Sequence, residues 1–90
     1  MDADSRLQRR SDVTFQSVAG EAILIRMDTG TYFSLNKIGT EFWDMLDGQQ
    51  SVAQHAAVIA AKYNVDAAMV TNDLLELSGK LAAERLVDVN

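Results

Sequence analysis

The chain changes its hydrophobic period at Asn36, and this change limits the folds that it can adopt. Before Asn36, in Gly30-Thr31-Tyr32-Phe33-Ser34-Leu35, apolar and polar side chains alternate as in a strand with one buried face. After Asn36 apolar residues recur every three or four positions, which is the period of a helix. Asparagine is a favourable residue for capping a helix start. The chain is therefore expected to pass directly from a sheet into a group of helices.

Three strands are expected before this junction. The segment 13–17 alternates, 21–27 is rich in β-branched residues, and 31–35 leads back to the junction. Ala19-Gly20 and Asp28-Thr29-Gly30 supply the turns, because glycine accepts the positive φ that tight turns need. Sequential strands joined by short turns form an antiparallel meander.

Three helices are expected after the junction. The first ends at Asp47-Gly48, the second runs from the capping box of Ser51 and Gln54 to Asn64, and the third runs from the cap Asp66 to about Glu84. The order βββααα, with helices on one side of an antiparallel sheet, predicts an α+β fold on the winged-helix plan.

The two ends of the chain are expected to behave differently. Residues 1–11 are polar and aperiodic, which predicts a flexible N-terminal arm before one domain at 12–90. The apolar tail 86–89 is expected to lie extended against the sheet.

The expected third helix carries three stripes of side chains. Its core stripe contains Val70, Leu74, Leu77 and Leu81, and one flank carries Asp73, Glu76, Lys80 and Glu84. The other flank is small and apolar, and it contains Thr71, Leu75, Ser78 and Ala82, with Gly79 at its border. This flank is either a surface on which another chain lies or an extension of the core. Gly79 favours the first alternative, because glycine in a helix costs about 0.8–1.0 kcal/mol relative to alanine.

Composition excludes several classes of protein. The net charge is −5, which disfavours a nucleic-acid partner because phosphate is also negative. The 90 residues contain no cysteine, no run long enough to cross a membrane and no signal peptide, so a cytoplasmic location is expected.

No catalytic or metal-binding pattern occurs in the chain. The single histidine, His55, has no cysteine or suitably spaced carboxylates beside it, and we expect a half-exposed structural side chain. The glycines form neither a dinucleotide fingerprint nor a phosphate loop. We therefore predict no enzyme activity, no metal and no cofactor.

An ordered set of segments resembles PqqD-like proteins over about residues 12–89. These segments are Gly-Glu-Ala-Ile-Leu-Ile (20–25), Gly-Thr-Tyr-Phe-Ser-Leu-Asn (30–36), Phe-Trp-Asp-Met-Leu-Asp-Gly (42–48), Ser-Val (51–52), Lys-Tyr-Asn-Val-Asp (62–66) and Asp-Leu-Leu-Glu-Leu (73–77). Members of this family are peptide chaperones of pyrroloquinoline quinone synthesis and related recognition elements for ribosomally made, modified peptides.

The resemblance implies a non-catalytic domain that binds the leader segment of a precursor peptide and presents the precursor to a modifying enzyme or a leader protease. The leader would add as a strand to the edge of the third strand and lie between that strand and the third helix. The expected peptide-binding residues are therefore Thr31, Tyr32, Phe33, Ser34 and Leu35 on the strand, with Thr71, Leu75, Ser78, Gly79 and Ala82 on the helix.

Two positions depart from the family pattern. Arg85 stands where members usually end the third helix with glycine, which predicts a less sharply ended helix. Ser78 stands where a large apolar residue is common, which predicts a wider groove.

Several alternatives stay open at this point. The pathway is of the lasso-peptide, radical-SAM or quinone-cofactor type. A winged-helix DNA-binding regulator is the competing function, and a subunit that forms a homodimer through its open sheet edge is a third.

Overall fold

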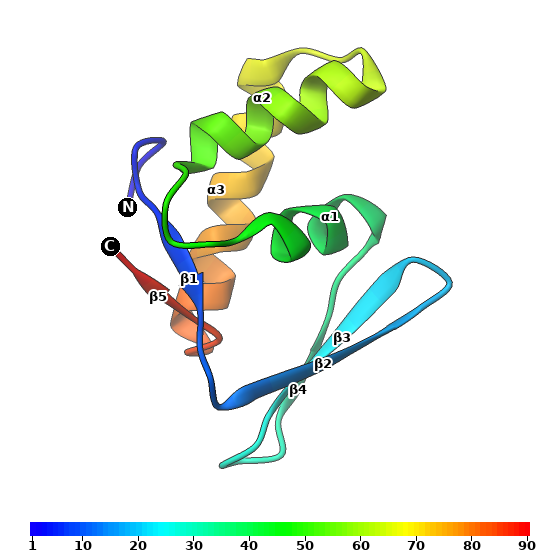
Figure 1. Cartoon of the computed structure of the whole chain (residues 1–90), viewed down its shortest axis with the longest axis vertical. Coiled ribbons are helices and arrows are strands. Elements are labelled where there is room, and N and C mark those ends of the chain that lie inside the picture. Colours follow the sequence, from blue (N-terminus) through cyan, green and yellow to red (C-terminus); the bar gives the residue numbers. More distant parts are fainter.

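The computed structural model describes residues 1–90 and contains two antiparallel sheets and three helices. The elements are β1 (Leu7–Arg9), β2 (Val13–Val18), β3 (Glu21–Arg26), β4 (Tyr32–Ser34), α1 (Lys37–Met45), α2 (Val52–Tyr63), α3 (Ala67–Ala83) and β5 (Val87–Val89). The larger sheet is the meander β2-β3-β4, and Figure 1 shows the helices gathered on one side of it. The predicted α+β fold, a three-stranded sheet followed by three helices, is confirmed.

The helices begin where the sequence places their caps. The Asn36 side chain accepts a hydrogen bond from the Gly39 amide at 2.8 Å, and Asp66 accepts one from Ala68 at 3.0 Å. Ser51 and Gln54 form the complete reciprocal capping box. These contacts satisfy amide groups that the first turn of a helix leaves without partners.

A buried threonine joins α1 to the meander. The Thr40 hydroxyl oxygen accepts a hydrogen bond from the Ala22 amide at 2.8 Å and donates one to the Asn36 carbonyl, also at 2.8 Å. Next to it, the Leu35 amide donates to the Ala22 carbonyl at 2.8 Å. The end of β4 and the start of α1 are thereby held against β3.

The core lies between the inner face of the meander and the helices. Phe42 and Trp43 of α1 are both fully buried, and Phe15 meets the Trp43 ring edge to face at 5.8 Å. His55 is also buried, with 1% of its surface exposed, so the prediction of a half-exposed histidine was wrong. Its ring packs edge to face against Phe42 at 5.7 Å, which explains its place in the core.

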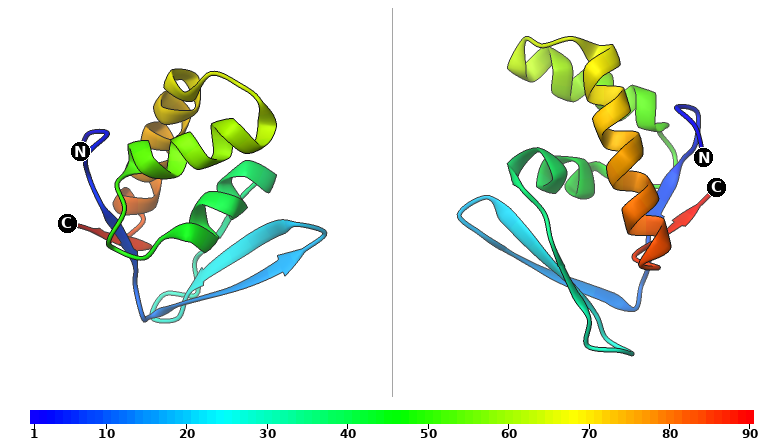
Figure 2. Two further views of the ribbon diagram at one scale, coloured as in Figure 1. Left: turned by 45° about the horizontal axis from the view of Figure 1, so that its top comes forward. Right: turned by 180° about the vertical axis from the view of Figure 1, so that it is seen from behind.

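The N-terminal segment contradicts the prediction of a loose arm. Leu7–Arg9 forms β1 and pairs with β5, with Leu7 opposite Val89 and Arg9 opposite Val87. The Leu7 side chain is buried, because it supplies one apolar anchor within an otherwise polar segment. Figure 2 shows these two strands side by side, away from the meander. The tail 86–89 is therefore extended as predicted at 87–89, but its partner is β1 rather than the larger sheet.

The end of α3 is sharper than Arg85 suggests. Arg85 adopts a left-handed conformation with φ of 55°. Its amide donates to the Ala82 carbonyl at 3.0 Å, and the Leu86 amide donates to the Leu81 carbonyl at 2.9 Å. These two bonds form a Schellman motif, which the buried side chains of Leu81 and Leu86 accompany. Arg85 therefore occupies the left-handed position after the helix C-cap, where glycine is usual. The prediction of a less sharply ended third helix was wrong.

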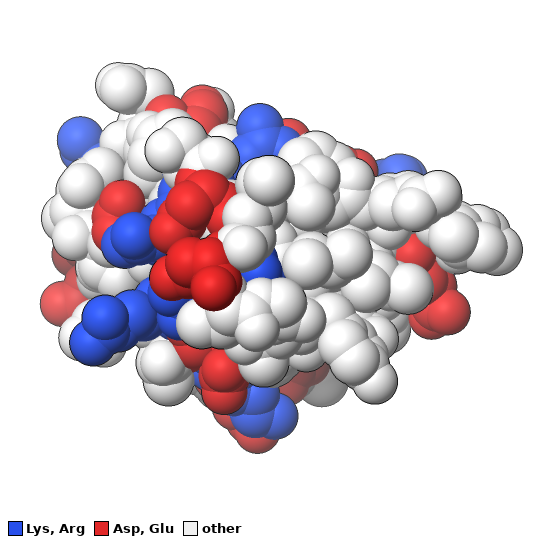
Figure 3. All heavy atoms as spheres, turned by 90° about the horizontal axis from the view of Figure 1, so that it is seen from below, with Lys and Arg blue, Asp and Glu red and all other residues white.

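The outer face of the meander has no helix over it. Ile23, Ile25 and Tyr32 project from this face and are exposed, with Ile25 and Tyr32 directly opposite each other. In Figure 3, which views the molecule from below, most charged side chains gather on the left, and a broad uncharged area extends from the centre to the right, with a smaller acidic group at its right-hand edge. Exposed apolar side chains on an antiparallel sheet are unusual where the face meets only water.

Candidate functional site: a groove between β4 and α3

The strand β4 is an edge strand with one free side. The Arg26 amide donates to the Thr31 carbonyl at 2.9 Å, and the Leu35 amide donates to the Ala22 carbonyl at 2.8 Å. In an antiparallel pair, residues that face the partner alternate with residues whose amide and carbonyl point away. With Leu24 opposite Phe33, the backbone groups of Tyr32 and Ser34 are those that point outward. They are available to a further strand.

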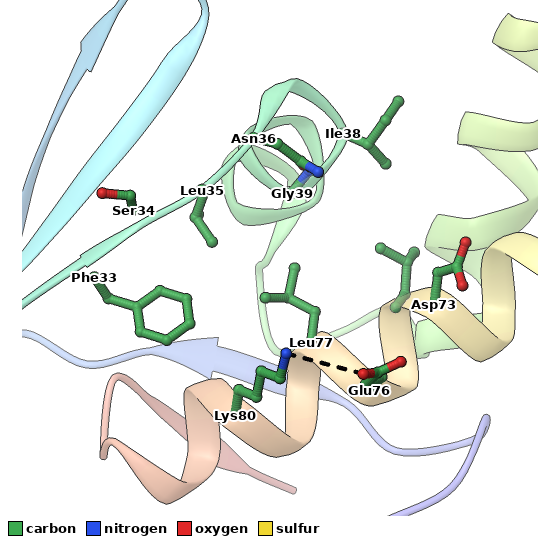
Figure 4. Close-up of a pocket in the computed structure, with 11 residues that line it drawn as sticks. Phe33, Ser34, Leu35, Asn36, Ile38, Gly39, Asp73, Glu76, Leu77 and Lys80 are labelled. Atoms are coloured by element: carbon green, nitrogen blue, oxygen red, sulfur yellow. Dashed lines mark hydrogen bonds and ion pairs between the residues drawn. The ribbon is translucent and has the colours of Figure 1, made fainter.

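A hollow of about 460 Å³ lies beside this free edge. Its wall is made by the end of β4, the first turn of α1 and one face of α3, as Figure 4 shows. The lining residues are Phe33, Ser34, Leu35, Asn36, Ile38, Gly39, Asp73, Leu74, Glu76, Leu77 and Lys80. We call this hollow the β4–α3 groove.

The floor of the groove is apolar. Leu35 and Leu74 are buried, whereas Phe33, Ile38 and Leu77 are partly exposed to the groove. A Cβ atom at Gly39 would lie 3.3 Å from Leu77 Cδ2, so the glycine allows α3 to approach α1 closely. The exposed parts of the floor side chains form a surface on which an apolar side chain would lose its contact with water.

The α3 rim of the groove is charged, and its two ends carry side chains of opposite charge. Lys80 lies at the Phe33 end, and Asp73 lies at the Ile38 end (Figure 4). Lys80 Nζ is 3.9 Å from a carboxylate oxygen of Glu76, and both side chains are largely exposed. Asp73 has no cation within ion-pair distance. The α3 rim at the Ile38 end therefore carries a carboxylate without an ion-pair partner.

The structure places the predicted strand residues at the groove or next to it. Phe33, Ser34 and Leu35 line the groove. Thr31 and Tyr32 lie beyond its end, where they border a shallow depression of about 10 Å³ with Arg26.

The predicted helix residues lie outside the lining of the groove. They are Thr71, Leu75, Ser78, Gly79 and Ala82. Ser78 is completely buried, and Leu75 and Ala82 pack partly against the core. A Cβ atom at Gly79 would meet nothing within 4 Å, so no other backbone approaches it. Leu75, Ser78 and Ala82 of this flank therefore lie against the core, whereas Gly79 is exposed, and Ser78 does not widen the groove. The role of this flank in peptide binding stays a prediction.

Helical periodicity could not distinguish the two flanks. It shows that Asp73, Glu76 and Lys80 lie on one side of the core stripe and Leu75 on the other, but not which side meets β4. That choice depends on how α3 packs against α1 and α2. One signal was available: Gly39 stands three residues after the cap Asn36, and a glycine in a helix often marks a close contact.

The groove carries no set of catalytic groups. None of its lining residues is a histidine or a cysteine, and its one serine, Ser34, has no base beside it. His55 lies in the core, and burial lowers the pKa of its imidazole, against a smaller opposing effect of Asp47. No group of three or more acidic or histidine side chains is arranged to hold a metal ion. None of the helices has the length and apolar character that a membrane span requires.

Comparison with known proteins identifies relatives of this architecture. The profile of the PqqD family, described as coenzyme PQQ synthesis protein D, matches residues 21–87, which is more than half of the chain. A solved structure, TbiB1 in complex with the TbiA(beta) leader peptide, superposes with a TM-score of 0.81 at 28% sequence identity. The match covers 90% of this chain and 94% of TbiB1. No curated protein matches the chain. The chain therefore belongs to the PqqD family, as the resemblance in its sequence indicated.

Proposed function

We propose that this protein is a non-catalytic binder of the leader segment of a ribosomally synthesised precursor peptide. The observation that carries the proposal is a free strand edge, β4, directly beside a groove with an apolar floor. Such an edge accepts a further strand through its outward backbone groups, and the groove accepts alternate side chains of that strand. Membership of the PqqD family and the likeness to TbiB1, which was solved with a leader peptide, support this function.

The leader forms a fourth strand on the meander. Its backbone pairs with the outward groups of Tyr32 and Ser34, and its inward side chains lie over Phe33, Leu35 and Leu77. The groove side of α3 replaces the flank of Leu75 as the helical half of the proposed site. Phe33, Ser34 and Leu35 remain proposed contacts, and Thr31 and Tyr32 contact the part of the leader that extends past the groove.

The bound precursor is presented to a separate modifying enzyme or leader protease. The pathway is of the lasso-peptide, radical-SAM or quinone-cofactor type. It operates in the cytoplasm, where ribosomes make the precursor. The exposed apolar outer face of the meander supports docking of such an enzyme. A homodimer through the open edge would occupy the same backbone groups as the leader and so compete with it.

A titration tests the proposal. The protein is titrated with the TbiA(beta) leader peptide, a scrambled peptide of the same composition and a DNA duplex. We expect the leader to bind saturably, and we expect neither the scrambled peptide nor the duplex to bind. Binding of the duplex would favour the DNA-binding regulator, for which neither the comparisons nor the acidic rim of α3 offers support. Equal binding of the leader and the scrambled peptide would contradict sequence-dependent recognition.

A further inference from the structure

The charged rim of the β4–α3 groove points to a selectivity that the apolar floor alone does not provide. At one end Lys80 is partly neutralised by Glu76, whereas Asp73 at the other end has no cationic partner. The chain as a whole carries a net charge of −5, so it repels an acidic peptide. A peptide segment in this groove should therefore bind most tightly if it carries a positive charge at the Asp73 end.

The spacing of the rim matches the spacing of a bound strand. Asp73 and Leu77 are one helical turn apart, which separates them by about 6 Å along α3. Two inward-facing residues of a strand are two positions apart, about 6.6–6.8 Å. An apolar leader side chain over Leu77 therefore brings the inward side chain two positions away next to Asp73, with Glu76 on the same rim.

The direction of the leader decides on which side of the apolar anchor this position falls. The strand β4 runs from the Lys80 end of the groove to the Asp73 end (Figure 4). The meander is antiparallel throughout, and antiparallel pairs are the more common and slightly more stable arrangement. The N-terminal part of a leader that runs antiparallel to β4 lies at the Asp73 end of the groove. In the leader sequence, the residue next to Asp73 therefore precedes the apolar anchor.

We infer that this protein selects leader segments in which a lysine or arginine stands two residues before a large apolar residue, with Asp73 and Glu76 facing the cation and Leu77 the apolar anchor. This inference rests on the proposed function, and it adds the chemical class of the leader that the groove accepts. The cation would compete with Lys80 for Glu76, so the Lys80→Gln variant should strengthen the preference.

Selection from a random peptide library displayed on phage tests the inference without knowledge of the natural leader. The wild-type protein should enrich lysine or arginine two positions before a shared apolar residue. The double variant Asp73→Lys/Glu76→Lys should enrich aspartate or glutamate there instead. The matched control Asp44→Lys/Glu21→Lys changes the net charge equally at exposed residues outside the groove, and it should keep the wild-type preference. If the lysine variant fails to fold by circular dichroism, Asp73→Asn/Glu76→Gln replaces it and should lose the preference.

The affinities of one selected peptide and its variants measure how much the cation contributes to binding. Replacing its cation by glutamine should weaken binding to the wild type about two- to fivefold, the range of an exposed ion pair. The same replacement should have almost no effect on the double variant, and the difference should shrink in about 0.5 M salt.

The outcomes separate this inference from the function beneath it. Enriched peptides that compete with the TbiA(beta) leader and need the β4 edge, yet show no cation at this position, would overturn the inference and leave leader binding intact. A cation found two residues after the anchor would overturn the antiparallel direction. If no enriched peptide depends on the β4 edge, as judged with the Ser34→Pro variant, both the inference and the proposed function are wrong.

Discussion

Leu75 and Leu77 are two residues apart, but they contribute to different parts of the molecule. Leu77 lines the β4–α3 groove, whereas Leu75 lies outside it and packs partly against the core. We expect Leu77→Ala to weaken leader binding about tenfold, because the loss of an apolar contact worth about 1.5 kcal/mol changes affinity by that factor. Calorimetric titration with one of the library-selected peptides that need the β4 edge measures the effect.

Leu75→Ala is the matched control for this prediction. Both variants remove the same atoms from partly buried leucines of α3, so both should lower the melting temperature. The affinity of the folded Leu75→Ala protein should equal that of the wild type. Loss of binding in Leu75→Ala with none in Leu77→Ala would return the site to the flank first predicted from the sequence.

The buried histidine should make stability depend on pH. Burial lowers the pKa of His55 below its ordinary value of about 6.5, and neither ring nitrogen has a hydrogen-bond partner. Below that ordinary value the unfolded chain binds a proton that the folded protein excludes. The free energy of unfolding should therefore fall as the pH drops through about 6.5, by at most about 1.4 kcal/mol per pH unit.

Urea unfolding at a series of pH values between about 5 and 7.5 measures this dependence. In the variant His55→Leu the dependence between about pH 5.5 and 7.5 should disappear, and what remains near pH 5 comes from carboxylates such as Glu41, whose pKa is lowered by the hydrogen bond from Lys62. A wild-type curve that is flat in the same range would show that the imidazole gains a partner when it is protonated.

At the scale of the elements, β4 provides the clearest test of strand addition. Proline at position 34 removes an amide that points away from β3, so it should spare the meander and block one backbone bond to the leader. We expect Ser34→Pro to bind the leader at least tenfold more weakly with little change in melting temperature. In the wild type, hydrogen exchange of the Tyr32 and Ser34 amides should slow when the leader is bound.

The neighbouring position serves as the control. Phe33 faces β3 through its backbone, so Phe33→Pro should break the sheet and lower the melting temperature strongly. Unchanged exchange at Tyr32 and Ser34 with saturating leader would exclude strand addition at this edge.

The C-terminus of α3 predicts a stabilising substitution. Arg85 holds a left-handed backbone conformation that costs a residue with a side chain about 1 kcal/mol and glycine almost nothing. Arg85→Gly should therefore stabilise the protein by about 0.5–1 kcal/mol, the greater freedom of glycine in the unfolded chain offsetting part of the gain. Thermal unfolding measures it, and Arg85→Ala, which keeps the side-chain penalty, should show no such gain.

The elements that the sequence predicted well are those with local determinants. Asn36, Ser51 and Asp66 cap the helices through bonds within a few residues, so short motifs reveal them. The meander is visible for the same reason. The strand β1 was missed because its partner, β5, lies about eighty residues away in a polar context with one apolar anchor. The groove side of α3 was missed because it depends on tertiary packing.

At the scale of the whole molecule, the small sheet of β1 and β5 closes the fold. The Asn90 amide donates to the Arg6 carbonyl at 2.7 Å, so the two ends of the chain lie together, as Figure 1 shows. Leu7 brings this sheet into the core. We expect Leu7→Ala to lower the free energy of unfolding by about 2–5 kcal/mol, a large share for a domain of this size.

Denaturant unfolding measures this loss, and Gln8→Ala on the opposite, exposed side of β1 is the control. A Leu7→Ala variant as stable as the wild type would mean that residues 1–11 are the loose arm that their composition suggests.

The hydrogen bonds of Thr40 affect how much conformational entropy is lost when the leader binds. The buried Thr40 hydroxyl ties α1 to β3 through Ala22, while Leu35 ties the end of β4 to the same residue, so the α1 and β4 walls of the groove are already formed without a peptide. The protein then loses little conformational entropy on binding, and nearly all of the ordering cost falls on the peptide. Each leader residue that becomes ordered without a compensating contact weakens the complex. The segment of the leader that becomes ordered should therefore be no longer than the edge and groove that receive it.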